Sequence, residues 1–307
     1  MEANSIRYIL LAVLSVICLL GLTGNLLIVA ANFMKWKSLK SLQTSEKILS
    51  SLAISRGLYF FTILMWNFFF RFFPKLAHRI IVLSVLYILN MCTFYSSLWI
   101  ATILCVFYCV KIVAYNYKLF IILKTRISTM APWLLQASLL ISLICSLPFG
   151  WYGYHVKLKK SSNGTTENMM EQRLATAKRF NERFLVFAVG SFPPFLIFCA
   201  ANLMLIHFLL MHTRRMRGNE SNIQSPNLKS YFNVLKSMSL FLLLQIMSFI
   251  CMSVFISGKL HHFDFSILIG RIILCSPPLF HSLYLISSSS EVKKMFTLLC
   301  LGLFRYS

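Results

Sequence analysis

Seven long apolar stretches set the strongest limit on what this sequence can fold into. Each has about 20 or more nearly uncharged residues, the length that a helix needs to cross the ~30 Å hydrocarbon core of a bilayer. None shows the two-residue alternation of a membrane-spanning strand, so helices are the structure that satisfies their backbone groups in lipid. We predict an all-α integral membrane protein, one bundle over residues 1–307. Its seven helices are expected at about 8–34, 47–70, 80–110, 130–153, 183–211, 231–257 and 265–287.

The composition supports a membrane setting. The chain is 58% hydrophobic and 12% charged, whereas an ordinary soluble chain carries about 25% charged residues. The short lead-in MEANSIR is nearly neutral and is not followed by a clear cleavage site, so we expect the first stretch to be retained as a span.

The loop charges predict an N-terminus outside the cell. Lysine and arginine are somewhat more numerous in the loops after the first, third and fifth spans and in the tail than in the other segments, and positive charge favours the cytoplasmic side. Glycosylation sequons at Asn163 and Asn219 fall on opposite sides of this topology. We therefore expect sugar on Asn163 only.

The charged residues argue against two classes of function. The net charge of +22 is scattered over the ends of spans, which favours contact with the lipid bilayer's headgroups over nucleic acid binding. The eight acidic residues all lie outside the span interiors, so neither a carboxylate pair for catalysis nor a mid-membrane proton relay is predicted. No enzyme activity, metal or cofactor is expected.

Polar residues recur at helical spacing within the spans. The third span carries such a stripe from Asn90 through Thr93 and Ser97 to Lys111, and the second and seventh carry Arg56 and Arg271. In lipid these faces must point into the bundle. Small and polar residues that merely hold helices together explain part of this pattern, but two costly intramembrane arginines require partners.

Arg56 lies close to mid-bilayer, about 14 Å from the end of its helix at 1.5 Å per residue. With no carboxylate at that depth, we expect its donors to reach Asn25, Ser282 and carbonyls freed near Pro277 and Pro278. Such a network would join the first, second and seventh spans. We interpret it as a hinge that pairs differently in two states. The predicted switch residues are Asn25, Arg56, Pro278, His281 and Ser282.

Several blocks of sequence resemble the bitter taste receptors, the taste receptor type 2 family. This chain resembles the family's first inner loop and second span in the stretch GNLLIVAANFMKWKSLKSLQTSEKILSSLAISR. It resembles the family's third span in the stretch LWIATILCVFYCVKIVAYNYKLFIILKTRI. The stretch PPFLIFCAANLMLIHFLLMHTRRM resembles the family's fifth span, and PLFHSLYLI resembles its seventh. The resemblance covers nearly the whole chain.

The resemblance implies a multi-pass G-protein-coupled receptor of the plasma membrane. It implies an outward-facing pocket for small-molecule bitter ligands, and an inner face for a heterotrimeric G protein of the gustducin or inhibitory type. Carried over by position, the ligand-binding residues are Trp66, Asn67, Asn90, Phe94, Phe187, Ser248, Arg271 and Leu274. The G-protein coupling residues are Tyr108, Lys111, Lys124, Arg126, His212 and Lys236.

Other positions and functions stay open at this point. Phe94, Tyr231 and Ser289 replace residues usual in the family, and Cys300 is either a palmitoylation site or a plain thiol. Arg271 either pairs with Asp264 or Glu182, or reaches the headgroups, or offers a cation to the ligand. The alternatives for the whole chain are a vomeronasal type 1-like pheromone receptor and, in a different class, a multi-pass transporter or channel.

Overall fold

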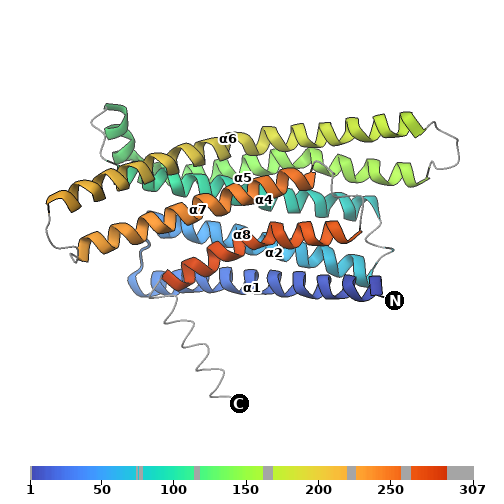
Figure 1. Cartoon of the computed structure of the whole chain (residues 1–307), viewed down its shortest axis with the longest axis horizontal. Coiled ribbons are helices and arrows are strands. Elements are labelled where there is room, and N and C mark those ends of the chain that lie inside the picture. Colours follow the sequence, from blue (N-terminus) through green and yellow to red (C-terminus); the bar gives the residue numbers. More distant parts are fainter. Residues whose placement is uncertain are drawn as a thin grey trace, which may run out of the picture.

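The chain folds into a bundle of long helices that run side by side (Figure 1). The computed structural model describes the backbone of residues 2–73, 75, 79–113, 118–161, 169–219, 226–256 and 264–288. Within these ranges the helices are α1 (Glu2–Leu39), α2 (Thr44–Phe72), α4 (Ile80–Ile112), α5 (Lys118–Ser161), α6 (Met169–Asn219), α7 (Pro226–Ile256) and α8 (Asp264–Ser288).

The seven described helices are each long and apolar enough to cross a membrane, and the described residues contain no strand. The predicted all-α bundle of seven spans is therefore confirmed. The helices α5 and α6 extend well beyond the expected 130–153 and 183–211. The extra turns of both helices contain several Lys and Arg, and those of α6 also contain Glu, Gln and Ala. These residues are good helix formers, but the charged ones interrupt the apolar pattern from which the spans were predicted.

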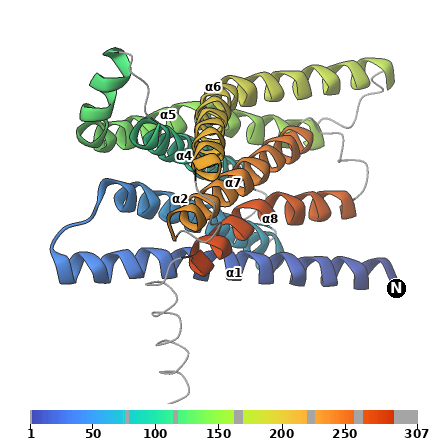
Figure 2. The same cartoon turned by 60° about the vertical axis from the view of Figure 1, so that its left-hand side comes forward.

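Successive helices alternate in direction, so α1, α4, α6 and α8 begin at the end of the bundle that holds the N-terminus (Figure 1). We call this the N-terminal end and the other the opposite end. The helix α4 lies at the centre and packs against α2, α5 and α6, while α1 packs against α2 and α8. Contacts of α7 with α6 and α8 close the arrangement. In both views α1 and α8 form one flank and α5 and α6 the other (Figures 1 and 2).

Apolar side chains cover the outside of the bundle as well as its interior. Trp133, Val189 and Ile81, for example, are 73%, 73% and 78% exposed. In water such a surface would aggregate, whereas lipid tails are as apolar as these side chains. The exposed apolar residues therefore mark the lipid-facing surface.

Small polar residues hold the helices together inside the bundle. The hydroxyls of Ser55 in α2 and Ser96 in α4 lie 2.6 Å apart, and Thr102 of α4 donates to the carbonyl oxygen of Pro194 in α6 at 2.9 Å. At the opposite end, Lys35 of α1 pairs with Glu46 of α2 at 2.6 Å. These bonds fix the helix rotations that decide which residues face the interior.

Candidate functional site

A large cavity opens between the helices at the N-terminal end of the bundle. It has a volume of about 340 Å³, within the range typical of sites for small organic molecules. Its wall is mostly aromatic and aliphatic. The lining comes from α2 (Tyr59, Ile63, Trp66, Phe70), α4 (Leu83, Tyr87, Asn90, Met91), α5 (Phe149), α6 (Arg183), α7 (Met252, Phe255, Ile256) and α8 (Ile267, Arg271, Leu274).

The polar groups of the large cavity are cationic or neutral. Arg183 and Arg271 line it, and none of its described lining residues is acidic. Asn90 also lines it and donates to the Thr62 hydroxyl at 3.4 Å. An apolar chamber with cations and an amide can hold a mainly apolar molecule by burial and orient a polar or anionic group on it.

Arg271 is held in place from α2. Its Nη1 donates to Oδ1 of Asn67 at 3.4 Å, and its guanidinium carbon lies 5.1 Å from the centre of the Trp66 ring. The ring contact favours the cation. Of the two acids considered as partners, Glu182 is exposed and forms no ion pair with a described residue, and the side chain of Asp264 lies outside the described part.

The predicted ligand residues fall into three groups. Trp66, Asn90, Arg271 and Leu274 line the large cavity, and Asn67 supports it through Arg271. Phe94 and Ser248 instead line a second, smaller cavity. Phe187 is completely buried and lines neither cavity; its ring centre lies 6.0 Å from those of Phe94 and Phe249.

Several wall residues were not anticipated. Tyr87 lies 4.8 Å from Trp66 between ring centres, and Phe149 and Met252 contribute from α5 and α7. Tyr87 is one turn before Asn90 on α4, so its place on the polar stripe was a usable signal. For Phe149 and Met252, within uniformly apolar spans, the sequence offers no comparable pattern.

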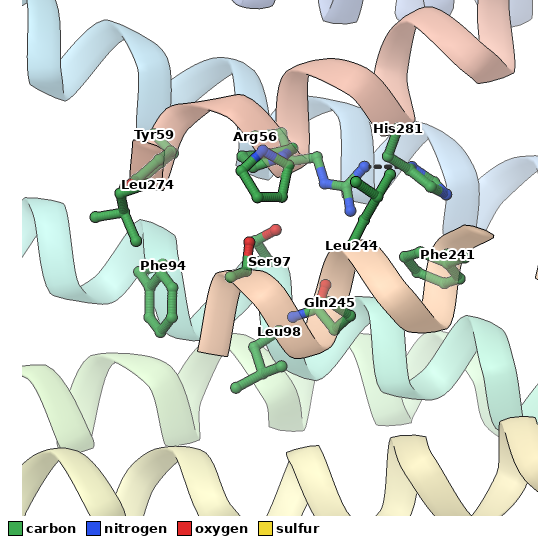
Figure 3. Close-up of a pocket in the computed structure, with 13 residues that line it drawn as sticks. Arg56, Tyr59, Phe94, Ser97, Leu98, Phe241, Leu244, Gln245, Leu274 and His281 are labelled. Atoms are coloured by element: carbon green, nitrogen blue, oxygen red, sulfur yellow. Dashed lines mark hydrogen bonds between the residues drawn. The ribbon is translucent and has the colours of Figure 1, made fainter. Parts of the chain in front are cut away.

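A small cavity of about 30 Å³ lies deeper in the bundle, around Arg56 (Figure 3). Its lining includes Ser97 of α4 together with Phe241 and Gln245 of α7 and His281 of α8. Tyr59 and Leu274 line both cavities. One layer of side chains therefore separates the small cavity from the large one.

Arg56 bonds to His281 rather than to the acceptors expected from the sequence. Its Nη1 lies 2.5 Å from Nδ1 of His281 (Figure 3). A guanidinium can only donate, so Nδ1 accepts and the ring is neutral with its proton on Nε2. The rings of Phe241 and His281 are 4.2 Å apart, and the Arg56 guanidinium lies 6.0 Å from the centre of Phe241.

The prediction that Asn25 and Ser282 accept from Arg56 is wrong. Ser282 donates to Oδ1 of Asn25 at 3.1 Å and to the carbonyl oxygen of Pro278 at 2.9 Å. Neighbouring residues on a helix point about 100° apart, so His281 faces α2 and α7 while Ser282 faces α1. The predicted connection among the three helices exists, but as two separate bonds that share α8.

The predicted G-protein residues lie at helix ends on the opposite side of the bundle. They come from the end of α4, the start of α5, the later part of α6 and the start of α7, which the alternating directions place together (Figure 1). Lys111, Lys124, Arg126 and Lys236 are exposed, whereas Tyr108 and His212 are partly buried. This end therefore presents a cationic surface. The predicted sugar site Asn163, Cys300, Ser289 and the side chain of Tyr231 lie outside the described residues.

The comparisons with known proteins decide the family. The family model described as Taste receptor protein (TAS2R) matches residues 2–303. The chain belongs to the taste receptor type 2 family. It is 29% identical to taste receptor type 2 member 39 of Mus musculus over 291 residues, 93% of this chain and 89% of that relative.

Other type 2 taste receptors are similar over most of their length. The chain is 32% identical to member 1 of Pan paniscus over 302 residues, 96% of this chain and 95% of that relative. It is 28% identical to member 9 of Homo sapiens over 281 residues, 90% of this chain and 88% of that relative. The protein is thus a bitter taste G-protein-coupled receptor, a multi-pass protein of the plasma membrane and not an enzyme. The pheromone receptor and transporter alternatives are left without support.

Proposed function

We propose that this type 2 taste receptor binds small, mainly apolar bitter compounds in the large cavity and signals through an inhibitory, gustducin-type G protein at the opposite end. The observation that carries the proposal is the cavity of about 340 Å³, whose lining combines aromatic side chains with the cations Arg183 and Arg271. Burial of apolar surface would supply most of the affinity, and Trp66, Asn90, Arg271 and Leu274 would set the orientation of the ligand.

The proposal includes an orientation in the membrane. The N-terminal end, with the large cavity, would face the outside, and the cationic end would face the cytoplasm. Lys111, Lys124, Arg126 and Lys236 are exposed there, and the excess of lysine and arginine in those loops favours that side. Tyr108 and His212 would complete the G-protein contact.

Between the two ends, Asn25, Arg56, Pro278, His281 and Ser282 would act as the conformational switch. The support is their placement: α8 is bonded to α2 through His281 and to α1 through Ser282, directly beneath the wall shared with the large cavity. A ligand that moves α8 would alter both bonds at once.

Filling the cavity tests where the ligand binds. Ile267 of α8 lines the large cavity, whereas Ile269, two residues on, is 45% exposed on the lipid side. We expect Ile267→Trp to abolish calcium responses to a bitter-compound panel in cells carrying a promiscuous G protein, and Ile269→Trp to preserve them at equal surface level. Equal responses from both variants would place the ligand elsewhere.

The partner is tested separately with purified proteins. Agonist should accelerate nucleotide exchange on an inhibitory-type heterotrimer and leave a stimulatory-type heterotrimer unchanged. If agonist accelerates nucleotide exchange only on the stimulatory-type heterotrimer, the assignment of the G protein is wrong, whereas that of the ligand site is unaffected.

A further inference from the structure

Arg56 is a buried cation without a described counter-charge. It is 3% exposed, and its only described hydrogen bond goes to His281, which is neutral. The one ion pair among the described side chains joins Lys35 and Glu46, far from this depth. The Nε of Arg56 has no partner among the described residues. An intramembrane charge in this condition is costly and is normally paired.

The small cavity lies directly against this charge. The second terminal nitrogen of Arg56 points away from His281, toward the side that Leu244 and Gln245 line (Figure 3). The cavity volume of about 30 Å³ exceeds the ~10–15 Å³ that a cavity needs to hold one water molecule. The space therefore has room for one or two water molecules or for one monatomic ion, and is far smaller than the ~300 Å³ or more that is typical of sites for organic ligands.

Three polar side chains around the same cavity form no hydrogen bond with another described residue. They are Ser97, Gln245 and Ser248. Other serines inside the helices, such as Ser55 and Ser282, do form such bonds. Ser248 is buried, and Ser97 and Gln245 are partly buried. Polar groups inside a protein are normally satisfied, so these three donors are available to a partner inside the cavity.

We propose that the small cavity binds a single chloride-sized anion that neutralises Arg56. The hydroxyls of Ser97 and Ser248 and the amide of Gln245 would donate to it, together with the guanidinium, whose positive charge repels any cation. The anion would join α2, α4 and α7 at the level of the switch. This inference does not rest on the identity of the bitter ligand or of the G protein.

The test is the thermal stability of the purified, full-length receptor in lipid nanodiscs without agonist. Sodium gluconate is replaced by sodium chloride at a constant ionic strength of about 0.15 M. Gluconate is too large for the cavity, so chloride should raise the Tm by about 2–4 °C, saturably, and bromide should do the same.

Variants test whether the chloride-dependent rise in Tm arises at the small cavity. Arg56→Gln and Ser97→Val should lose the chloride-dependent shift, because one removes the charge and the other fills the cavity. If Arg56→Gln does not fold, Ser97→Val keeps the test decisive because it retains the arginine. The control Arg71→Gln, which removes an exposed cation near the end of the same helix, should keep the full shift.

Two outcomes would overturn the proposal. An identical Tm in chloride and gluconate would mean that the cavity holds water only. A chloride shift that persists in both Arg56→Gln and Ser97→Val would place the anion at another site.

Discussion

At the scale of single residues, the two intramembrane arginines of this receptor lie in different surroundings. Arg271 lines the large cavity and is aimed by Asn67 and Trp66. Arg56 lies below the shared wall, bonded to His281 and packed near Phe241. Both face the interior of the bundle, as intramembrane charges must. In the proposed function the first would contact the ligand, whereas the second bonds α2 to α8.

Arg56→Ala should uncouple signalling more than it disturbs ligand binding. The side chain contributes to the small cavity and not to the wall of the large one, so ligand affinity should change by less than about threefold. The maximal response should fall strongly because α2 and α8 lose their bond. Arg56→Lys should restore it in part, since a point charge cannot reproduce the guanidinium geometry.

The measurement is a radioligand or fluorescent-ligand binding curve beside a calcium dose–response at matched surface level. An unchanged dose–response in Arg56→Ala would rule out the coupling role.

Arg271→Ala should separate ligands by charge. The guanidinium lines a cavity whose described walls hold no acid, so anionic agonists should lose more than about tenfold in potency, or about 1.4 kcal/mol. Neutral agonists should be spared. Dose–response curves for matched acid and ester pairs provide the comparison, and an equal loss for both members of a pair would indicate a structural role through Asn67 and Trp66.

The sequence could predict which residues face inward but not what each one touches. The sequence placed Arg56 on an interior face by helical spacing and Phe94 in the pocket by the family resemblance, and both are buried. It could not show that Phe94, packed beside Tyr95 and Phe187, would end up lining the small cavity. Nor could it decide between His281 and Ser282 as the partner of Arg56, because that depends on the rotation of α8 about its axis.

At the scale of helices, close approach depends on small residues. Gly21 of α1 packs directly against the ring of Phe60 in α2: a Cβ added there would lie 2.5 Å from the ring. Gly57 of α2 faces α1 as well, but a Cβ there would meet Leu22 at an ordinary 3.7 Å. Phe60 is completely buried, so its ring cannot turn out toward the lipid without losing its contacts in the core.

Gly21→Ala should therefore destabilise the receptor by about 1–3 kcal/mol through overpacking. Gly57→Ala, on the facing helix, should be neutral or slightly stabilising because alanine favours helix over glycine. The Tm of the two purified variants and their surface expression supply the measurement. A similar Tm for both would show that α1 can shift to accommodate the added methyl group.

The helix ends, like the side-chain contacts, could be predicted only in part from the sequence. Hydropathy located every span because the bilayer fixes the length of apolar sequence that a helix needs. It did not locate the ends of α5 at Lys118 and Ser161, because Lys and Arg interrupt the apolar pattern near both ends while they remain good helix formers.

At the scale of the whole molecule, the two ends of the bundle differ in character. The N-terminal end holds the large cavity within one apolar core cluster, which includes Phe60, Tyr95 and Met252. The opposite end has its own core cluster, which includes Leu104, Leu205 and Ile127, and exposes cations around it. The Arg56 cavity lies where the two clusters meet, and its lining includes Phe94 from the first and Phe241 from the second.

The topology predicts that only one sequon carries sugar. In the sequence Asn163 comes after α5, which ends at the N-terminal end of the bundle, whereas Asn219 is the last residue of α6 and lies at the opposite end. With the N-terminal end outside, endoglycosidase should shift the electrophoretic mobility of the wild type and of Asn219→Gln. It should leave Asn163→Gln unchanged. Sugar on Asn219 would reverse the orientation of the bundle.

The wall shared by the two cavities has a pharmacological consequence. Tyr59 and Leu274 each present one side to the large cavity and the other to the space around Arg56. A short molecule lodged near Trp66 gains its binding energy without pressing on this wall, whereas a longer one reaches it. Across a homologous series, affinity should then grow smoothly with size while efficacy rises abruptly at one length. The shorter members would be competitive antagonists of the longer ones.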